Sequence, residues 1–278
     1  MRNLDWFAMM VLWMVVACSG RSVDVPRTRV ARTNGGAIVL SADERVAVVT
    51  NRSASVVTVF RLAPEQGSGT TLVIGATSIP ISDGSEPWAS VVGVDDDTAY
   101  VLFRGARSVG KITGLHGSKP TLEDDRAGVG SEPTAITISP SGQKLFVANW
   151  GEGTVSLITT ADFVPQTKID LNQVLVETTA LGDVSARPAL AHPRALAITD
   201  NGDDDDLDET LYATEFFSQP IAGMQAATDV DRNRQGFVYP MSVRTGQPGA
   251  AISIAPVSQT GFADSEGVMT GCFPNQLY

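Results

Sequence analysis

Hydrophobic and polar residues alternate along most of the chain, and short polar turns interrupt the alternation at regular places. Three segments share one arrangement of two alternating stretches around such a turn: RVAVVTNRSASVVTVFRL from Arg45, TAYVLFRGARSVGKITGL from Thr98 and KLFVANWGEGTVSLITTA from Lys144. Successive side chains of a strand point to opposite faces, so this pattern predicts three equivalent β-hairpins.

A further apolar strand is expected before each hairpin, at residues 37–40, 91–94 and 135–138. Each is followed by a turn rich in Asp, Ser, Pro or Gly, residues that accept or preset the dihedral angles of a tight reversal. A fourth unit begins at Pro193 with the same pattern, although an acidic insertion separates its strands. A recurring unit built only of strands predicts an all-β chain, a β-propeller of four-stranded antiparallel blades.

A β-sandwich would also explain alternating strands and turns. It would not explain why three units open with Pro-x-Ala, at Pro87, Pro133 and Pro193, or why the hairpin spacing is constant. The best candidate for a helix, KIDLNQVLVETTALGD from Lys168, is interpreted instead as an inter-blade strand and loop.

The third unit, EPTAITISPSGQKLFVANWGEGTVSLITT, resembles the YVTN-type β-propeller repeat. Phe146, Val147, Ala148 and Asn149 occupy the tetrad that gives the repeat its name, and Pro133, Pro140, Gly142, Thr154 and Val155 hold their expected places. The repeat position of Asn149 is occupied by Asn51 in the first unit, but by Phe103 in the second and Glu215 in the fourth. The resemblance implies a propeller over residues 34–278, in a family that includes lactonases and propeller parts of periplasmic redox enzymes.

The chain ends with FPNQLY, whose Pro-x-x-Leu spacing matches Pro193 and Leu196 at the opening of the fourth unit. We therefore expect about four blades and the start of a fifth, in a propeller truncated at its C-terminus. A four-bladed ring completed by this last fragment is the alternative. Cys272 would find its partner in the sequence that follows, or remain a buried free thiol.

The first residues have the pattern of an export signal. Trp6–Ala17 is an apolar run too short to span a bilayer, and Val15–Cys18 resembles the bacterial lipobox. The resemblance implies that residues 1–17 are a lipoprotein signal peptide, that Cys18 is lipidated, and that residues 18–33 are a tether. Ser19 in place of aspartate favours the outer membrane by analogy. An ordinary signal peptide with a chance cysteine is the alternative.

Charge and composition narrow the functions further. The chain has 20 lysines and arginines against 31 acidic residues, a net charge of -11 that argues against nucleic acid as a partner. It has only two histidines, His116 and His192, and no G-x-S-x-G or C-x-x-C-H motif. These features favour a non-enzymatic role: an envelope-anchored binding or scaffold module for an unknown protein or small molecule. The alternative implied by the resemblance is a lactonase-like hydrolase or the accessory propeller of a periplasmic redox enzyme.

Two acidic segments are candidate calcium ligands, because calcium is held by six to eight oxygen atoms. The candidates are Asp203, Asp205 and Asp208 in the acidic insertion, and Asp229, Asp231 and Asn233 further along. The first set lacks the spacing of a known calcium loop, and an arginine replaces the turn glycine of the second, so a solvated acidic loop is the alternative. Trp88 and Trp150 are expected to be buried between sheets, unless they line a binding face.

Overall fold

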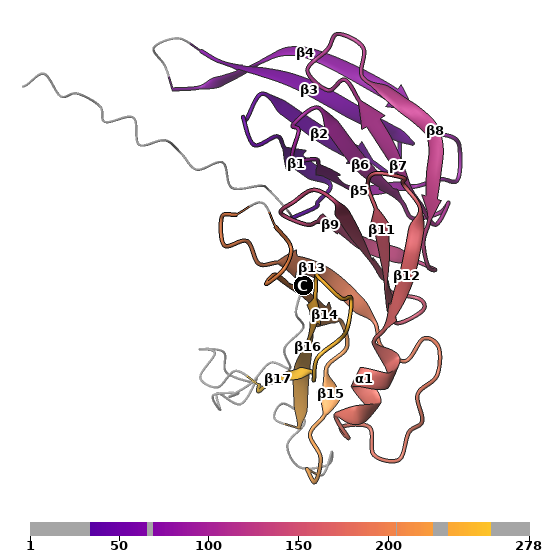
Figure 1. The fold of residues 1–278 in the computed structure, drawn as a ribbon. Helices are drawn as coiled ribbons and strands as arrows, with labels where there is room; N and C mark the ends of the chain where they lie inside the picture. The colour runs from indigo at the N-terminus through magenta and orange to yellow at the C-terminus, as the bar shows by residue number, and fades with distance from the viewer. Residues whose placement is uncertain (1–33, 66–68, 204, 225–232, 257–278) are drawn as a thin grey trace, which may run out of the picture.

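A computed structural model describes residues 34–65, 69–203, 205–224 and 233–256. These residues form four antiparallel sheets that lie side by side in an arc, with β4, β8 and β12 on its convex side (Figure 1). The proposed signal peptide, Cys18, Cys272 and the proposed start of a fifth blade lie outside the described residues. Among the described residues, no helix has the length and apolar character needed to cross a membrane.

The first three sheets share one plan, in which each strand pairs with the next one along the chain. The first blade contains β1 (Ile38–Leu40), β2 (Val46–Asn51), β3 (Val56–Pro64) and β4 (Thr71–Pro80). The second contains β5 (Pro87–Val92), β6 (Thr98–Phe103), β7 (Ser108–Thr113) and β8 (Thr121–Gly128). The third contains β9 (Pro133–Ile138), β10 (Lys144–Asn149), β11 (Thr154–Thr159) and β12 (Pro165–Asp170). The three predicted hairpins are confirmed.

The fourth sheet is also antiparallel but has five strands, of which the outer ones are short. It contains β13 (Pro193–Ile198), β14 (Thr210–Glu215), β15 (Gln219–Pro220), β16 (Arg234–Ser242) and β17 (Ile252–Ile254). Both β15 and β17 pair with β16. The fourth unit predicted from the Pro193 opening is therefore a blade of the propeller.

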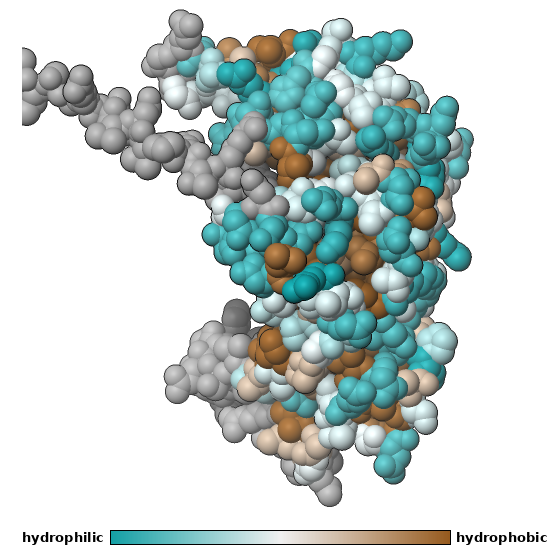
Figure 2. All heavy atoms as spheres, viewed as in Figure 1, coloured by the Kyte–Doolittle hydropathy of each residue, from teal (hydrophilic) through white to brown (hydrophobic). Residues whose placement is uncertain are grey.

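The hydrophobic core is divided among the junctions between neighbouring blades. One cluster joins the first and second blades, another the second and third, and a third joins the third and fourth. Strand β6 shows how the sequence achieves this: Ala99, Val101 and Phe103 face the first blade, while Tyr100 and Leu102 face the third. Both faces of such a strand are covered, unlike those of a sandwich strand. The exterior is correspondingly polar over most of the face in Figure 2, with hydrophobic residues in separate patches.

The turns repeat at the level of backbone dihedral angles. The turn after the first strand of a blade has a residue with positive φ at Glu44, Asp96 and Gly142, with φ of 62°, 58° and 73°. The turn between the second and third strands has one at Ser55, Arg107 and Gly153. Glycine adopts this conformation without steric cost, whereas other residues pay about 1 kcal/mol or more. The third unit has glycine at both positions, so its two turns avoid this cost.

A short segment before β1 crosses the inner side of the arc. Asn34 forms a bridge with Thr137 of β9, and Gly36 forms one with Ser90 of β5. A side chain at the intervening Gly35 would place its Cβ 2.2 Å from the carbonyl oxygen of Ile136, so this position requires glycine. The segment therefore lies directly against the innermost strands of the second and third blades.

A short helix and strand β5 differ most from the sequence prediction. The segment from Lys168 completes β12, as expected, but then forms helix α1 (Asn172–Glu177) where a loop was predicted. Val174 and Leu175 are buried against the fourth blade, and this tertiary contact stabilises a helix too short to show a helical period. Strand β5 begins at Pro87 rather than Val91, since a proline is tolerated as the first residue of a strand.

Candidate functional site

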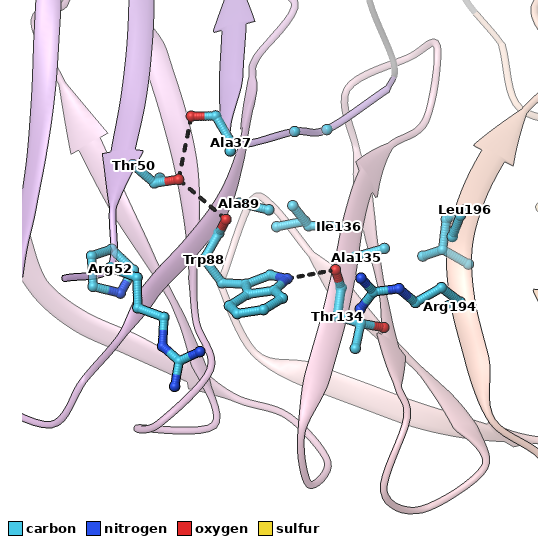
Figure 3. Close-up of a pocket in the computed structure, with 14 residues that line it drawn as sticks. Ala37, Thr50, Arg52, Trp88, Ala89, Thr134, Ala135, Ile136, Arg194 and Leu196 are labelled. Atoms are coloured by element: carbon cyan, nitrogen blue, oxygen red, sulfur yellow. Dashed lines mark hydrogen bonds between the residues drawn. The ribbon is translucent and has the colours of Figure 1, made fainter. Parts of the chain in front are cut away.

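A pocket of about 460 Å³ opens where the innermost strands of the second, third and fourth blades begin (Figure 3). Its most prominent side chains follow the opening prolines: Trp88, Thr134 and Arg194 occupy the same position of successive Pro-x-Ala motifs. The first blade contributes Arg52, just after β2. The pocket is therefore lined by the starts of three innermost strands and, on the side of the first blade, by residues 35–37, Thr50 and Arg52.

Trp88 is fixed in the centre of this pocket. Its indole Nε1 donates a hydrogen bond to the carbonyl oxygen of Thr134 at 3.0 Å, and its own carbonyl accepts the hydroxyl of Thr50 at 3.1 Å. The guanidinium groups of Arg104 and Arg52 lie over the indole ring, 4.6 and 5.5 Å from its centroid, in cation–π geometry. Trp88 and Trp150 are both half-buried rather than buried between sheets, and Trp88 lines the pocket, which was the alternative to burial.

The two arginines that lie over Trp88 form equivalent ion pairs. Arg52 forms an ion pair with Glu86 of the next blade at 2.7 Å, and Arg104 forms the equivalent pair with Glu132 at 3.4 Å. At the third junction, the rings of Trp150 and His192 make the corresponding contact, with centroids 4.8 Å apart. The same two repeat positions thus form an Arg–Glu ion pair at the first two junctions and an aromatic contact at the third.

Arg194 stands apart from these pairs. Its guanidinium lies 6.0 Å from the ring centroid of Phe216 and, within the described part of the chain, forms no ion pair or hydrogen bond. Figure 3 shows this side chain extending towards Thr134 and Ala135 inside the pocket. A guanidinium offers five N–H donors in a planar fork that matches the geometry of carboxylate and phosphate. This arginine can therefore accept an anionic partner.

A buried carboxyl group lies across the sheet from the residue before Arg194, because Glu215 of β14 pairs with Pro193 of β13. Glu215 has a fully buried side chain that accepts the backbone N–H of His192 at 2.9 Å and the hydroxyl of Tyr239 at 2.8 Å. Burial raises the pKa of Glu215 to about 7. Burial also lowers the pKa of His192, whose buried Nδ1 has no hydrogen-bond partner among the described residues.

Glu215 of the fourth blade is at the repeat position that Asn149 occupies in the third blade. There the side-chain oxygen of Asn149 accepts the N–H of Gly130 at 2.9 Å, and its amide group donates to Ser156 at 2.9 Å and to Thr154 at 3.0 Å. Asn149 and Glu215 therefore each accept a backbone N–H from the segment that leads into the innermost strand of their own blade. The departure of Glu215 from the repeat motif was the sequence signal for a titratable group at this position.

The structure brings together three of the six candidate calcium ligands. One carboxylate oxygen from each of Asp203, Asp205 and Asp208 lies within 4.8 Å of the others, in the exposed loop between β13 and β14. Asp229 and Asp231 lie outside the described residues. Asn233 is buried and precedes β16, whereas the acidic loop lies near the far end of that strand, where Thr210 pairs with Ser242. Calcium binding by the loop remains a prediction.

The four antiparallel sheets, arranged side by side with the first strand of each on the inner side, identify the fold as a β-propeller. Solved structures with a similar fold include hydrazine synthase from Kuenenia stuttgartiensis, at 19% identity and a TM-score of 0.52 over 82% of this chain and 51% of that one. A Lactobacillus plantarum protein has 13% identity and a TM-score of 0.51 over 87% and 57% of the two chains. A proposed 6-phosphogluconolactonase from Bacteroides fragilis has 15% identity and a TM-score of 0.50 over 80% and 55%.

These similarities concern the fold, and the chain spans little more than half the length of each of the three solved chains. No protein-family model and no curated protein sequence matches it.

Proposed function

We propose that the chain belongs to an envelope-anchored lipoprotein whose propeller, of the YVTN type, binds a small anionic ligand in the pocket around Trp88. The observation that supports this most directly is Arg194, a half-buried cation without a carboxylate partner in the described structure of an acidic protein. Removing a charged group from water is unfavourable unless another group compensates it. A bound anion would provide that compensation through charge-assisted hydrogen bonds.

The composition of the pocket favours binding over hydrolysis. Opening a lactone ring would use a general base close to the reacting carbon. Among the described residues that line the pocket, none is an aspartate, glutamate, histidine or cysteine. The remaining lining is mostly alanine, glycine and aliphatic residues, as in many small-molecule sites, which typically enclose about 300–1,000 Å³.

Calorimetric titration of the full chain with hexanoate, a simple monocarboxylate, tests the binding site. We expect Arg194→Gln to weaken binding roughly tenfold or more, because it removes a charge-assisted interaction in a partly desolvated site. Lys111→Gln is the matched control: it also removes one positive charge, from an ion pair with Glu123 on the outer strands of the second blade. Absence of binding, or equal affinity in the two variants, would refute the proposal.

Anchoring is tested separately, by metabolic labelling with an alkyne fatty acid. Lipidation at Cys18 predicts label in the wild-type protein and none in Cys18→Ser. Equal labelling of both proteins would exclude that residue as the anchor.

A further inference from the structure

Building on the anion site proposed at Arg194, we infer that the ligand carries two anionic groups at opposite ends of an apolar body, as in a short dicarboxylate. The second anionic group would be held by Arg52. Failure of the site at Arg194 would remove the basis of this inference, whereas the site at Arg194 does not depend on Arg52.

The two arginines enter the pocket from opposite sides. Arg52 comes from the turn after β2 in the first blade, and Arg194 from the start of β13 in the fourth. Figure 3 shows them on either side of the Trp88 indole, with Arg194 extended over the third blade. A ligand that bridges the pocket would therefore meet one guanidinium at each end.

The surface between the two arginines is largely apolar. Ala89, Ala135 and Ile136 line it between the two guanidinium groups, and the indole nitrogen of Trp88 already donates to Thr134. A ligand rich in hydroxyl groups would leave several of them without partners on this surface, at a cost for each one buried. Methylene groups gain free energy by leaving water there. The lining thus favours an apolar chain between the charges.

Arg52 is able to bind such a ligand despite its ion pair. Its side chain is 52% exposed and that of Glu86 33%, and an exposed pair of this kind contributes little to stability. The guanidinium has five donors, of which the pair with Glu86 uses one. Its position over the indole limits its rotation, which lowers the entropy lost on binding. Arg104, held in the equivalent ion pair, does not line the pocket.

The experiment compares adipate with its monomethyl ester, which has the same carbon skeleton and one carboxylate fewer. Calorimetric titration of the full chain at pH 7 should show adipate binding roughly tenfold or more tightly than the ester, because a second charge-assisted contact forms. Arg52→Gln should bring the two affinities close together. Glu86→Gln should increase the preference for adipate, since it removes the carboxylate that competes for Arg52.

Lys111→Gln controls for the loss of one positive charge and should leave the preference for adipate unchanged. Equal affinity of adipate and ester in the wild-type protein would overturn the dicarboxylate inference, while binding that depends on Arg194 would still support the anion site. A preference that persists in Arg52→Gln would also overturn the inference. If neither compound binds, both proposals fail. The melting temperature of each variant shows whether it is folded.

Discussion

The buried carboxyl of Glu215 gives the fourth blade a pH-dependent stability that glutamine should remove. Its pKa rises from 4.5 to about 7, a difference of about 2.5 pH units. At 1.36 kcal/mol per unit, the ionised side chain costs the folded state about 3 kcal/mol. This cost follows from full burial of the carboxylate, which only partly recovers its solvation from His192 and Tyr239.

The direction of the effect follows from proton uptake. Between pH 4.5 and 7 the folded state binds more protons at Glu215 than the unfolded state does, so stability falls as pH rises through this window. Glutamine retains an oxygen that can accept the His192 N–H, and its amide can donate to the Tyr239 hydroxyl oxygen. We expect Glu215→Gln to be about 3 kcal/mol more stable than wild type at pH 8, with little difference at pH 4.

Urea unfolding between pH 4 and 8.5 measures this difference. Glu177→Gln is the control, because Glu177 is exposed on α1 and its replacement removes the same charge. Parallel pH profiles for wild type and Glu215→Gln, or a less stable variant at pH 8, would show that the buried carboxyl does not limit stability.

Two further predictions concern the repeat and the acidic loop. Asn149→Ala should lower the free energy of unfolding by about 3 kcal/mol, because it leaves a buried N–H of Gly130 without its acceptor, whereas Asn51→Ala at the exposed equivalent position should cost much less. Urea unfolding compares the two, and equal losses would contradict the assignment. If the acidic loop binds calcium, millimolar calcium should raise the melting temperature, and replacing Asp203 and Asp205 with asparagine should abolish the increase. A melting curve that calcium does not change would leave the loop as a solvated acidic segment.

The repeat could be predicted from the sequence because each blade depends on local rules. The nearly continuous apolar run of β6 specifies two buried faces, and the turn residues with positive φ, such as Gly142 and Gly153, fix where each strand ends. Helix α1 could not be predicted in this way. Its six residues form a helix because Val174 and Leu175 pack against the fourth blade. The sequence of the helix alone does not show this contact.

The pocket was only partly visible in the sequence. The recurring Pro-x-Ala motif marked the positions of Trp88 and Arg194, but nothing in a single unit showed that they would face the same space as Arg52. Each blade contributes only a few residues to the pocket, so the blades must be arranged in space before the constellation appears. Glu215 was visible as a mismatch to the repeat, although its hydrogen bond comes from Tyr239 on β16, a neighbouring strand that lies 24 residues further along the chain.

The segment at residues 34–36 also determines how mechanical force enters the propeller. A pull on the amino-terminal chain reaches Asn34 first, and there it acts on the bridge to Thr137 in the third blade. The bridge from Gly36 to Ser90 transmits the load to the second blade before β1 is strained. Three blades therefore share the tension, while the fourth, which carries Arg194, lies outside this path.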